Sequence, residues 1–174
     1  MARFDELFDE FRGEAFRLET LPGYAVGQDA ERLADYAAGA YVLGSPIPGV
    51  EFVKGLVESG RRTTLVRLVE RPLTIDQRLS IDWVYPHHAV AGREIAILEP
   101  GSELAGNASV TGDFWLFDDT AVALMRYAPD GRFDRADVVE EPATVARYVA
   151  LRNQLWASAV PFGKWLGNWR RAVR

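Results

Sequence analysis

Apolar residues recur at helical spacing in four parts of the chain. Phe4, Leu7, Phe8 and Phe11 follow an i, i+3, i+4, i+7 pattern, which predicts an amphipathic helix over residues 3–15. The same criterion predicts three more helices, each with a residue at one end that favours a helix terminus. These helices begin at Asp29, extend over residues 50–59 up to Gly60, and run from Pro142 to Ala159.

Shorter runs with a two-residue period predict strands between the helices. Residues 16–20, 63–69 and 93–98 alternate in polarity or are rich in β-branched side chains. Residues 79–85 fit two periods, because Leu79 and Trp83 also share a helical face. The alternation over the whole segment favours a strand there.

Residues 113–140 carry the clearest signal for a sheet. Three strand-like runs, 114–117, 122–127 and 133–139, are separated by Asp-Asp-Thr and Pro-Asp-Gly. In the second separator, proline fixes φ at the first corner of a turn and glycine supplies the positive φ at its exit. This order predicts a three-stranded antiparallel meander.

Together these elements predict a single α+β domain over residues 1–174. Its antiparallel sheet includes the meander in the C-terminal half of the chain, and the helices at both ends pack on one face of that sheet. With 174 residues, of which 48% are hydrophobic, the chain can bury a core of its own.

Composition removes several classes of protein from consideration. The chain has no cysteine, which excludes disulfides and thiolate metal sites and fits a cytoplasmic location. The acidic start MARFDELFDEF lacks the basic and apolar regions of a secretory signal, and no apolar run predicts a membrane span. The net charge of −5 argues against nucleic acid as a partner of the whole protein.

Charge is distributed unevenly along the chain. Residues 142–174 contain six of the twenty Lys and Arg, none of the twenty-five Asp and Glu, and three of the five tryptophans. Such a tail is typical of a segment that docks on an acidic surface, which can be its own domain, a partner or nucleic acid. Packing on the acidic body is the simplest account, since large aromatic side chains are usually buried. The candidates for partner binding are Trp165, Trp169, Arg170 and Arg171.

Several polar residues interrupt apolar runs and are candidates for a polar pocket. They are Arg17, Glu19, Tyr85, His87, Glu94 and Asp118. In a strand over 63–69, Arg67 lies on the same side as Leu65, where it can pair with a carboxylate such as Glu19 or bind phosphate. The chain's two histidines, at 87 and 88, point apart in an extended segment, which argues against a shared metal. We therefore predict no metal and no cofactor.

The order of four segments resembles an uncharacterised actinobacterial family, a domain of unknown function. The segments are FDELFDEFRGEAFRLETLPGY, AGREIAIL, DFWLFDDTAVALMRYAPDGRF and PATVARYVALRNQLWASAVP. Members of this family are often encoded beside helix-turn-helix regulators of antitoxin-like systems, and the resemblance implies a regulatory partner or effector role without catalytic residues to carry over. The chain departs from the commoner form at residues 74–82.

Three functional hypotheses follow. The first is a non-enzymatic regulatory or interaction protein in a toxin-antitoxin-like system, whose partner is a helix-turn-helix regulator or a second copy of itself. The alternative is a growth-inhibiting effector enzyme, a nuclease or nucleotide-modifying toxin, whose pocket includes Arg17, Glu19, Tyr85, His87 and Asp118. A third hypothesis is small-ligand sensing in a pocket lined by Trp83, Trp115 and Tyr127.

Overall fold

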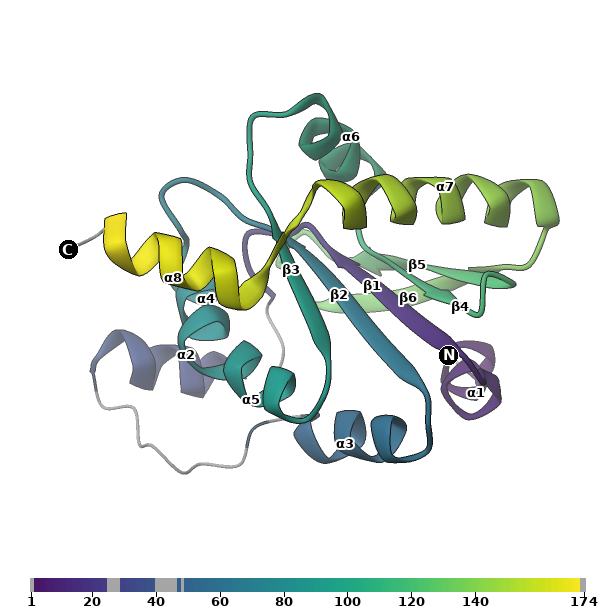
Figure 1. The fold of residues 1–174 in the computed structure, drawn as a ribbon, viewed down its shortest axis with the longest axis horizontal. Helices are drawn as coiled ribbons and strands as arrows, with labels where there is room; N and C mark the ends of the chain where they lie inside the picture. The colour runs from purple at the N-terminus through teal and green to yellow at the C-terminus, as the bar shows by residue number, and fades with distance from the viewer. Residues whose placement is uncertain (1, 25–28, 40–46, 48, 173–174) are drawn as a thin grey trace.

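A mixed seven-stranded sheet forms the centre of the molecule. The computed structural model describes residues 2–24, 29–39, 47 and 49–172. The strands follow the order β6-β5-β4-β1-β2-β3-β7 (Figure 1). Their bounds are β1 (Glu14–Glu19), β2 (Arg62–Leu68), β3 (Glu94–Leu98), β4 (Phe114–Phe117), β5 (Ala121–Tyr127), β6 (Phe133–Val139) and β7 (Val160–Pro161).

Helical segments flank the strands on both sides of the sheet. They are α1 (Ala2–Glu10), α2 (Asp29–Ala37), α3 (Val50–Glu58), α4 (Ile75–Leu79), the π-helical turn η1 (Ser80–Val84), α5 (Tyr85–Val90), α6 (Glu103–Thr111), α7 (Pro142–Ser158) and α8 (Phe162–Ala172). Within the described residues, no helix is long and apolar enough to cross a membrane.

The register of the central strands gives the sheet two faces of different character. β1, β2 and β3 are parallel, and β4 runs antiparallel to β1. Arg17 is paired with Leu65 on one side and with Trp115 on the other. Because side chains alternate along a strand, these residues share one face with Glu19 and Arg67. We call it the arginine face, and the opposite one the apolar face.

Helices α6 and α7 cover the apolar face. Phe16 and Leu18 from β1 pack there with Phe114 from β4 and with Val145 and Leu155 from α7. All five side chains are buried. The arginine face is covered by α1 at one end and by η1, α5 and α8 at the other. Helices therefore lie on both faces (Figure 1), and the prediction that they pack on one face is wrong.

Most of the predicted elements are present. The helix predicted over 50–59, the strands over 63–69 and 93–98, and the meander are all confirmed, with ends that shift by one or two residues. In the β4–β5 hairpin, Asp118 and Asp119 have φ of 50° and 57°. Positive φ at both central residues is the requirement of the type I′ turn, whose twist matches that of the flanking strands.

Helix α1 and strand β1 have other bounds than predicted. Helix α1 ends at Glu10 and β1 begins at Glu14, earlier than expected, because the Asp118 carboxylate accepts the backbone N–H groups of Arg12, Gly13 and Glu14. This contact stops the helix and fixes the start of the strand.

The C-terminal segment forms α8. The helix predicted to begin at Asp29 is present as α2, which ends at Ala37, and residues 40 and 41 lie outside the described residues.

Residues 79–85 are helical, so the predicted strand is wrong. Thr74 begins the helical segment through a capping box, in which its hydroxyl accepts from Gln77 N. The π-helical turn η1 then follows α4 without a break. A π-helical turn places an extra residue in the turn, and here Ile81, Trp83 and Tyr85 are all buried. Local capping thus outweighs the alternation.

Candidate functional site

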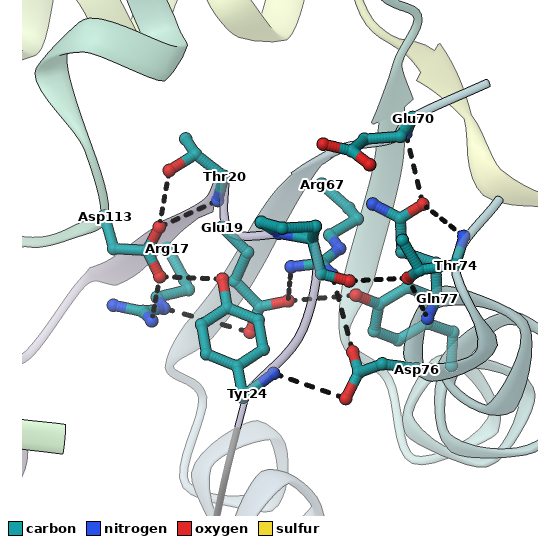
Figure 2. Close-up of polar contacts among 12 residues, drawn as sticks. Arg17, Glu19, Thr20, Tyr24, Arg67, Glu70, Thr74, Asp76, Gln77 and Asp113 are labelled. Carbon is teal, nitrogen blue, oxygen red and sulfur yellow. Dashed lines mark hydrogen bonds and ion pairs between the residues drawn. The ribbon is translucent and has the colours of Figure 1, made fainter. Parts of the chain in front are cut away.

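A buried ion pair between Arg17 and Asp113 links β1 to the residue that precedes β4. Arg17 Nη2 donates to Asp113 Oδ2 at 2.7 Å and to the hydroxyl of Tyr127 at 2.8 Å. Asp113 also accepts from the backbone and hydroxyl of Thr20, both at 2.8 Å, and from the hydroxyl of Tyr24 at 2.7 Å (Figure 2). The hydroxyl of Tyr127 donates to it as well, at 3.1 Å. The Asp113 carboxylate is therefore saturated with donors.

A second buried guanidinium, that of Arg67 on β2, lies beside this pair. Its side chain is 1% exposed and is 3.8 Å from Glu19 and 3.6 Å from Asp76. It also lies over the ring of Tyr24, with 5.0 Å between the guanidinium carbon and the ring centroid. Burial alone lowers the pKa of Arg67, but Tyr85, Tyr24 and the two carboxylates raise it overall. The expected pairing of Arg67 with Glu19 is thus confirmed.

Glu19 connects the two arginines to the helical layer. Its Oε1 lies 3.8 Å from Arg17 Nε, and its Oε2 accepts from the Tyr85 hydroxyl at 2.9 Å. Burial and the charge of Glu19 raise the pKa of Tyr85 well above its usual value. Tyr85 is therefore a neutral donor that ties α5 to β1. Figure 2 shows the network that runs from Asp113 through Arg17, Glu19 and Arg67 to Asp76.

A cavity of about 160 Å³ opens beside this network. Its apolar lining comes from β2, α4 and η1, and its polar lining from β1, Tyr24, α2, α4, η1, α5 and the residue before β3. The lining residues are Glu19, Tyr24, Arg32, Leu65, Asp76, Leu79, Ser80, Trp83, Val84, Tyr85, His88 and Arg93.

Arg67 and Arg93 both have buried nitrogens without a hydrogen-bond partner among the described residues. The Nη atoms of Arg67 lie 3.8 and 3.6 Å from the carboxylates of Glu19 and Asp76. Arg93 instead lines the cavity without an ion pair in the described part of the chain, and its unpartnered nitrogens are Nε and Nη2.

Burial lowers the pKa of Arg93, opposed by Glu19 and Tyr85. The guanidinium stacks over Trp115 at 5.4 Å from the ring centroid, and Arg17 lies over the same indole at 5.5 Å. Trp115 therefore orients both cations, but it supplies no acceptor.

The structure brings together half of the predicted polar pocket. Arg17, Glu19 and Tyr85 meet in the network described above. His87 instead is exposed, and its Nδ1 lies 2.7 Å from the Trp83 carbonyl oxygen. Glu94 pairs at the surface with Arg62.

Asp118 lies in the β4–β5 turn, where its carboxylate accepts backbone N–H groups of the α1–β1 connection, and it does not line the cavity. This contact explains why a polar residue occurs at position 118, within an apolar run. The predicted pocket did not include Asp113, His88 or Arg93. His88 is 8% exposed and lines the cavity. A helix over residues 85–90 would have identified His88, because it places His88 on the same buried side as Tyr85.

The C-terminal segment is largely part of the protein's own core. Trp165 is 3% exposed, donates through Nε1 to Glu99, and stacks on Trp169 with 5.8 Å between ring centroids. Its side chain therefore packs inside this chain. Arg170 and Arg171 are exposed at the end of α8 and face solvent.

The fold resembles solved structures at low sequence identity. A phospholipase D family member, Nuc from Salmonella typhimurium, has a TM-score of 0.54 and 8% identity, with 92% of this chain and 90% of that chain covered. NucT from Helicobacter pylori has a TM-score of 0.50 and 11% identity, with 92% and 91% covered.

An archaeal chromatin protein with a novel mode of DNA binding, TrmBL2, has a TM-score of 0.51 and 12% identity. The comparison covers 92% of this chain and 48% of that chain, so the present chain spans about half its length. At such identities the likeness concerns the fold alone. No curated protein sequence matches the chain.

The chain belongs to the family described as a domain of unknown function, DUF6879, which it matches over residues 2–167. The match includes the whole sheet, the cavity and most of α8.

Proposed function

We propose that this member of DUF6879 is a ligand-binding regulatory protein, whose cavity beside Arg93 accepts the anionic group of a small molecule. The observation that carries the proposal is the pair of buried Arg93 nitrogens without an acceptor. Buried donors in folded proteins nearly always have a partner, and an unsatisfied one costs about 1–3 kcal/mol. An oxyanion in the cavity supplies the acceptor, since the guanidinium fork matches carboxylate and phosphate oxygens.

The rest of the lining indicates the shape of such a ligand. Leu65, Leu79 and Trp83 are buried and form an apolar wall, while Ser80 and His88 add polar groups. Binding pockets typically combine an apolar lining with a few convergent polar groups. The ligand is therefore a small molecule with one anionic end and one apolar end. The names of two similar structures refer to phospholipase D and to DNA, both associated with phosphodiesters, which favours phosphate over carboxylate.

The test is a thermal-shift titration followed by calorimetry, with inorganic phosphate, a small phosphodiester and an aromatic carboxylate as probes. Wild-type protein is expected to be stabilised by at least one of them, because a ligand that binds only the folded state raises the Tm. Arg93→Met is expected to abolish that shift. It should also stabilise the ligand-free protein by about 1 kcal/mol, since it removes unsatisfied buried donors.

Arg62→Met is the matched control. Arg62 is an exposed arginine that pairs with Glu94 away from the cavity lining, so its loss should leave the Tm shift intact. If Arg93→Met keeps the full response to the probe, or if it destabilises the ligand-free protein as a structural arginine would, the anion site is refuted.

A regulatory role also needs a protein that receives the signal, and a helix-turn-helix regulator remains our proposed partner. Arg170 and Arg171 are exposed on α8, whereas Trp165 is part of the core. Removal of α8 would therefore unfold the protein and test nothing. A double charge reversal, Arg170→Glu with Arg171→Glu, leaves the core in place and is expected to abolish co-purification with the regulator; unchanged co-purification would exclude these residues from the contact.

A second candidate function is an effector enzyme that acts on a phosphodiester. The observation that favours it is that His88 and Arg93 line one cavity, which offers a proton-transfer group beside an anion-binding group. This hypothesis predicts that expression of the wild-type chain arrests growth and that His88→Ala relieves the arrest. Harmless expression of the wild-type chain would eliminate it.

A further inference from the structure

An apolar hollow lies on the edge of the sheet, away from the Arg93 cavity. It has a volume of about 520 Å³ and opens between α5, β3, the end of α7 and the start of α8. Its walls are mainly Ala89, Ile95, Ala96, Trp156, Ala159 and Phe162. Glu94 is the charged side chain in the lining, so the hollow suits an apolar side chain from outside.

An exposed apolar side chain stands next to this hollow. Val90, the last residue of α5, is 90% exposed, and its neighbour Ala89 forms part of the wall. A valine in water forgoes the roughly 1.5–3 kcal/mol that its full burial would contribute. The same patch of surface thus carries both a protruding apolar group and an apolar recess.

The adjacent sheet edge is only partly covered. The two-residue strand β7 pairs with β3 at Ala96 and Ile97. On that side, Glu94 and Ile95 have no strand partner among the described residues. An uncovered edge offers backbone donors and acceptors to another chain. At its rim, Glu94 and Arg62 provide charges of opposite sign that are about half exposed.

We infer that this face binds a second copy of the chain across a two-fold axis, with Val90 of each copy in the hollow of the other. A two-fold interface requires one self-complementary patch, so that every protrusion lies near the recess that receives its counterpart. Val90 and the hollow meet this condition, and the Glu94–Arg62 pair, formed within each chain at 3.0 Å, places charges of both signs beside the same axis. A second copy buries both features at once, whereas a partner that only fills the recess leaves Val90 in solvent.

The chain supplies a matched control for the test. Val110 on α6 is also 90% exposed, but it does not line any of the described hollows. Val90→Glu and Val110→Glu therefore introduce the same charge at equally exposed positions. Circular dichroism and thermal melts establish that both variants are folded.

The measurement is sedimentation equilibrium of the full chain. Wild-type protein and Val110→Glu should form a dimer at or below about 100 μM, and Val90→Glu should dissociate at least roughly tenfold more readily, as expected from the loss of a buried valine. Ala159→Trp, which fills the hollow, should weaken the dimer as well.

A wild-type chain that stays monomeric at this concentration overturns the inference. So does a dimer that Val90→Glu and Val110→Glu weaken equally. Neither outcome bears on the anion site, because Val90 and Ala159 do not line that cavity.

Discussion

The two faces of the sheet bury side chains of different kinds. The apolar face, under α6 and α7, is filled by aliphatic and aromatic side chains such as Phe16, Leu18 and Leu155. On the arginine face, the same strand β1 presents Arg17 and Glu19 to a buried network of ions. Buried ion pairs are weak evidence for stability, because desolvation offsets most of their attraction. The apolar face contributes to the fold through apolar burial, whereas the arginine face carries the site that we propose for binding.

The largest expected effect comes from breaking the network at its most connected carboxylate. Asp113 accepts five hydrogen bonds among the described residues. Asp113→Ala leaves the buried Arg17 without its closest counter-charge, with only Glu19, at 3.8 Å, among the described carboxylates, which should lower the free energy of unfolding by about 3–5 kcal/mol. Urea denaturation measures this change.

Asp134→Ala is the control for that experiment. Asp134 pairs with Arg135 at an exposed site on β6, where an ion pair contributes little, so the denaturation midpoint should barely move. Equal effects of the two substitutions would show that the buried network contributes no more to stability than an exposed ion pair.

A cavity in the apolar face should be nearly as destabilising but should leave binding intact. Leu155 on α7 is 0% exposed and packs on the strands. Leu155→Ala should lower the free energy of unfolding by about 2–5 kcal/mol. The thermal response to the anionic probe should keep its size, because α7 does not line the Arg93 cavity. A lost response in this variant would mean that the two faces are coupled.

The contrast between the faces was only partly visible in the sequence. The alternation in residues 63–69 placed Arg67 on one side and predicted its pairing with a carboxylate, which the 3.8 Å contact with Glu19 confirms. The meander was predictable because its turns are local. The parallel order of β1, β2 and β3 was not, since those strands are separated by helices and meet only through tertiary packing.

Prediction of the site depended on whether residues 79–85 form a strand or a helix, and their periodicity fits both. Residues 79–85 fitted a strand, and the strand assignment left His87 and His88 in an extended loop. Because the segment is helical, His88 faces the cavity and His87 faces outward. Arg93 gave no signal, since its importance lies in the acceptor that its environment lacks.

The smallest effect at neutral pH, and the most specific one, should come from Tyr85. Its hydroxyl donates to Glu19, so Tyr85→Phe should lower the free energy of unfolding by about 1–2 kcal/mol near pH 7. The folded state raises the pKa of Tyr85, first through burial and then through the Glu19 charge. In the unfolded chain a tyrosine ionises near pH ~10. Above that pH the unfolded state releases a proton that the folded state retains, so rising pH favours unfolding.

Wild-type stability should therefore fall steeply above about pH 10, whereas phenylalanine has no proton to release. The gap between wild type and Tyr85→Phe should close as the pH rises towards 11. Urea denaturation at pH 8, 10 and 11 measures both curves. Tyr127, whose pKa burial raises to about 12, adds to the decline in both proteins and cancels in the difference. A gap that stays constant over this range would mean that Tyr85 titrates normally in the folded protein. The network around Glu19 would then be open to water, and the arginine face would have no closed, water-excluding site to set it apart from the rest of the surface.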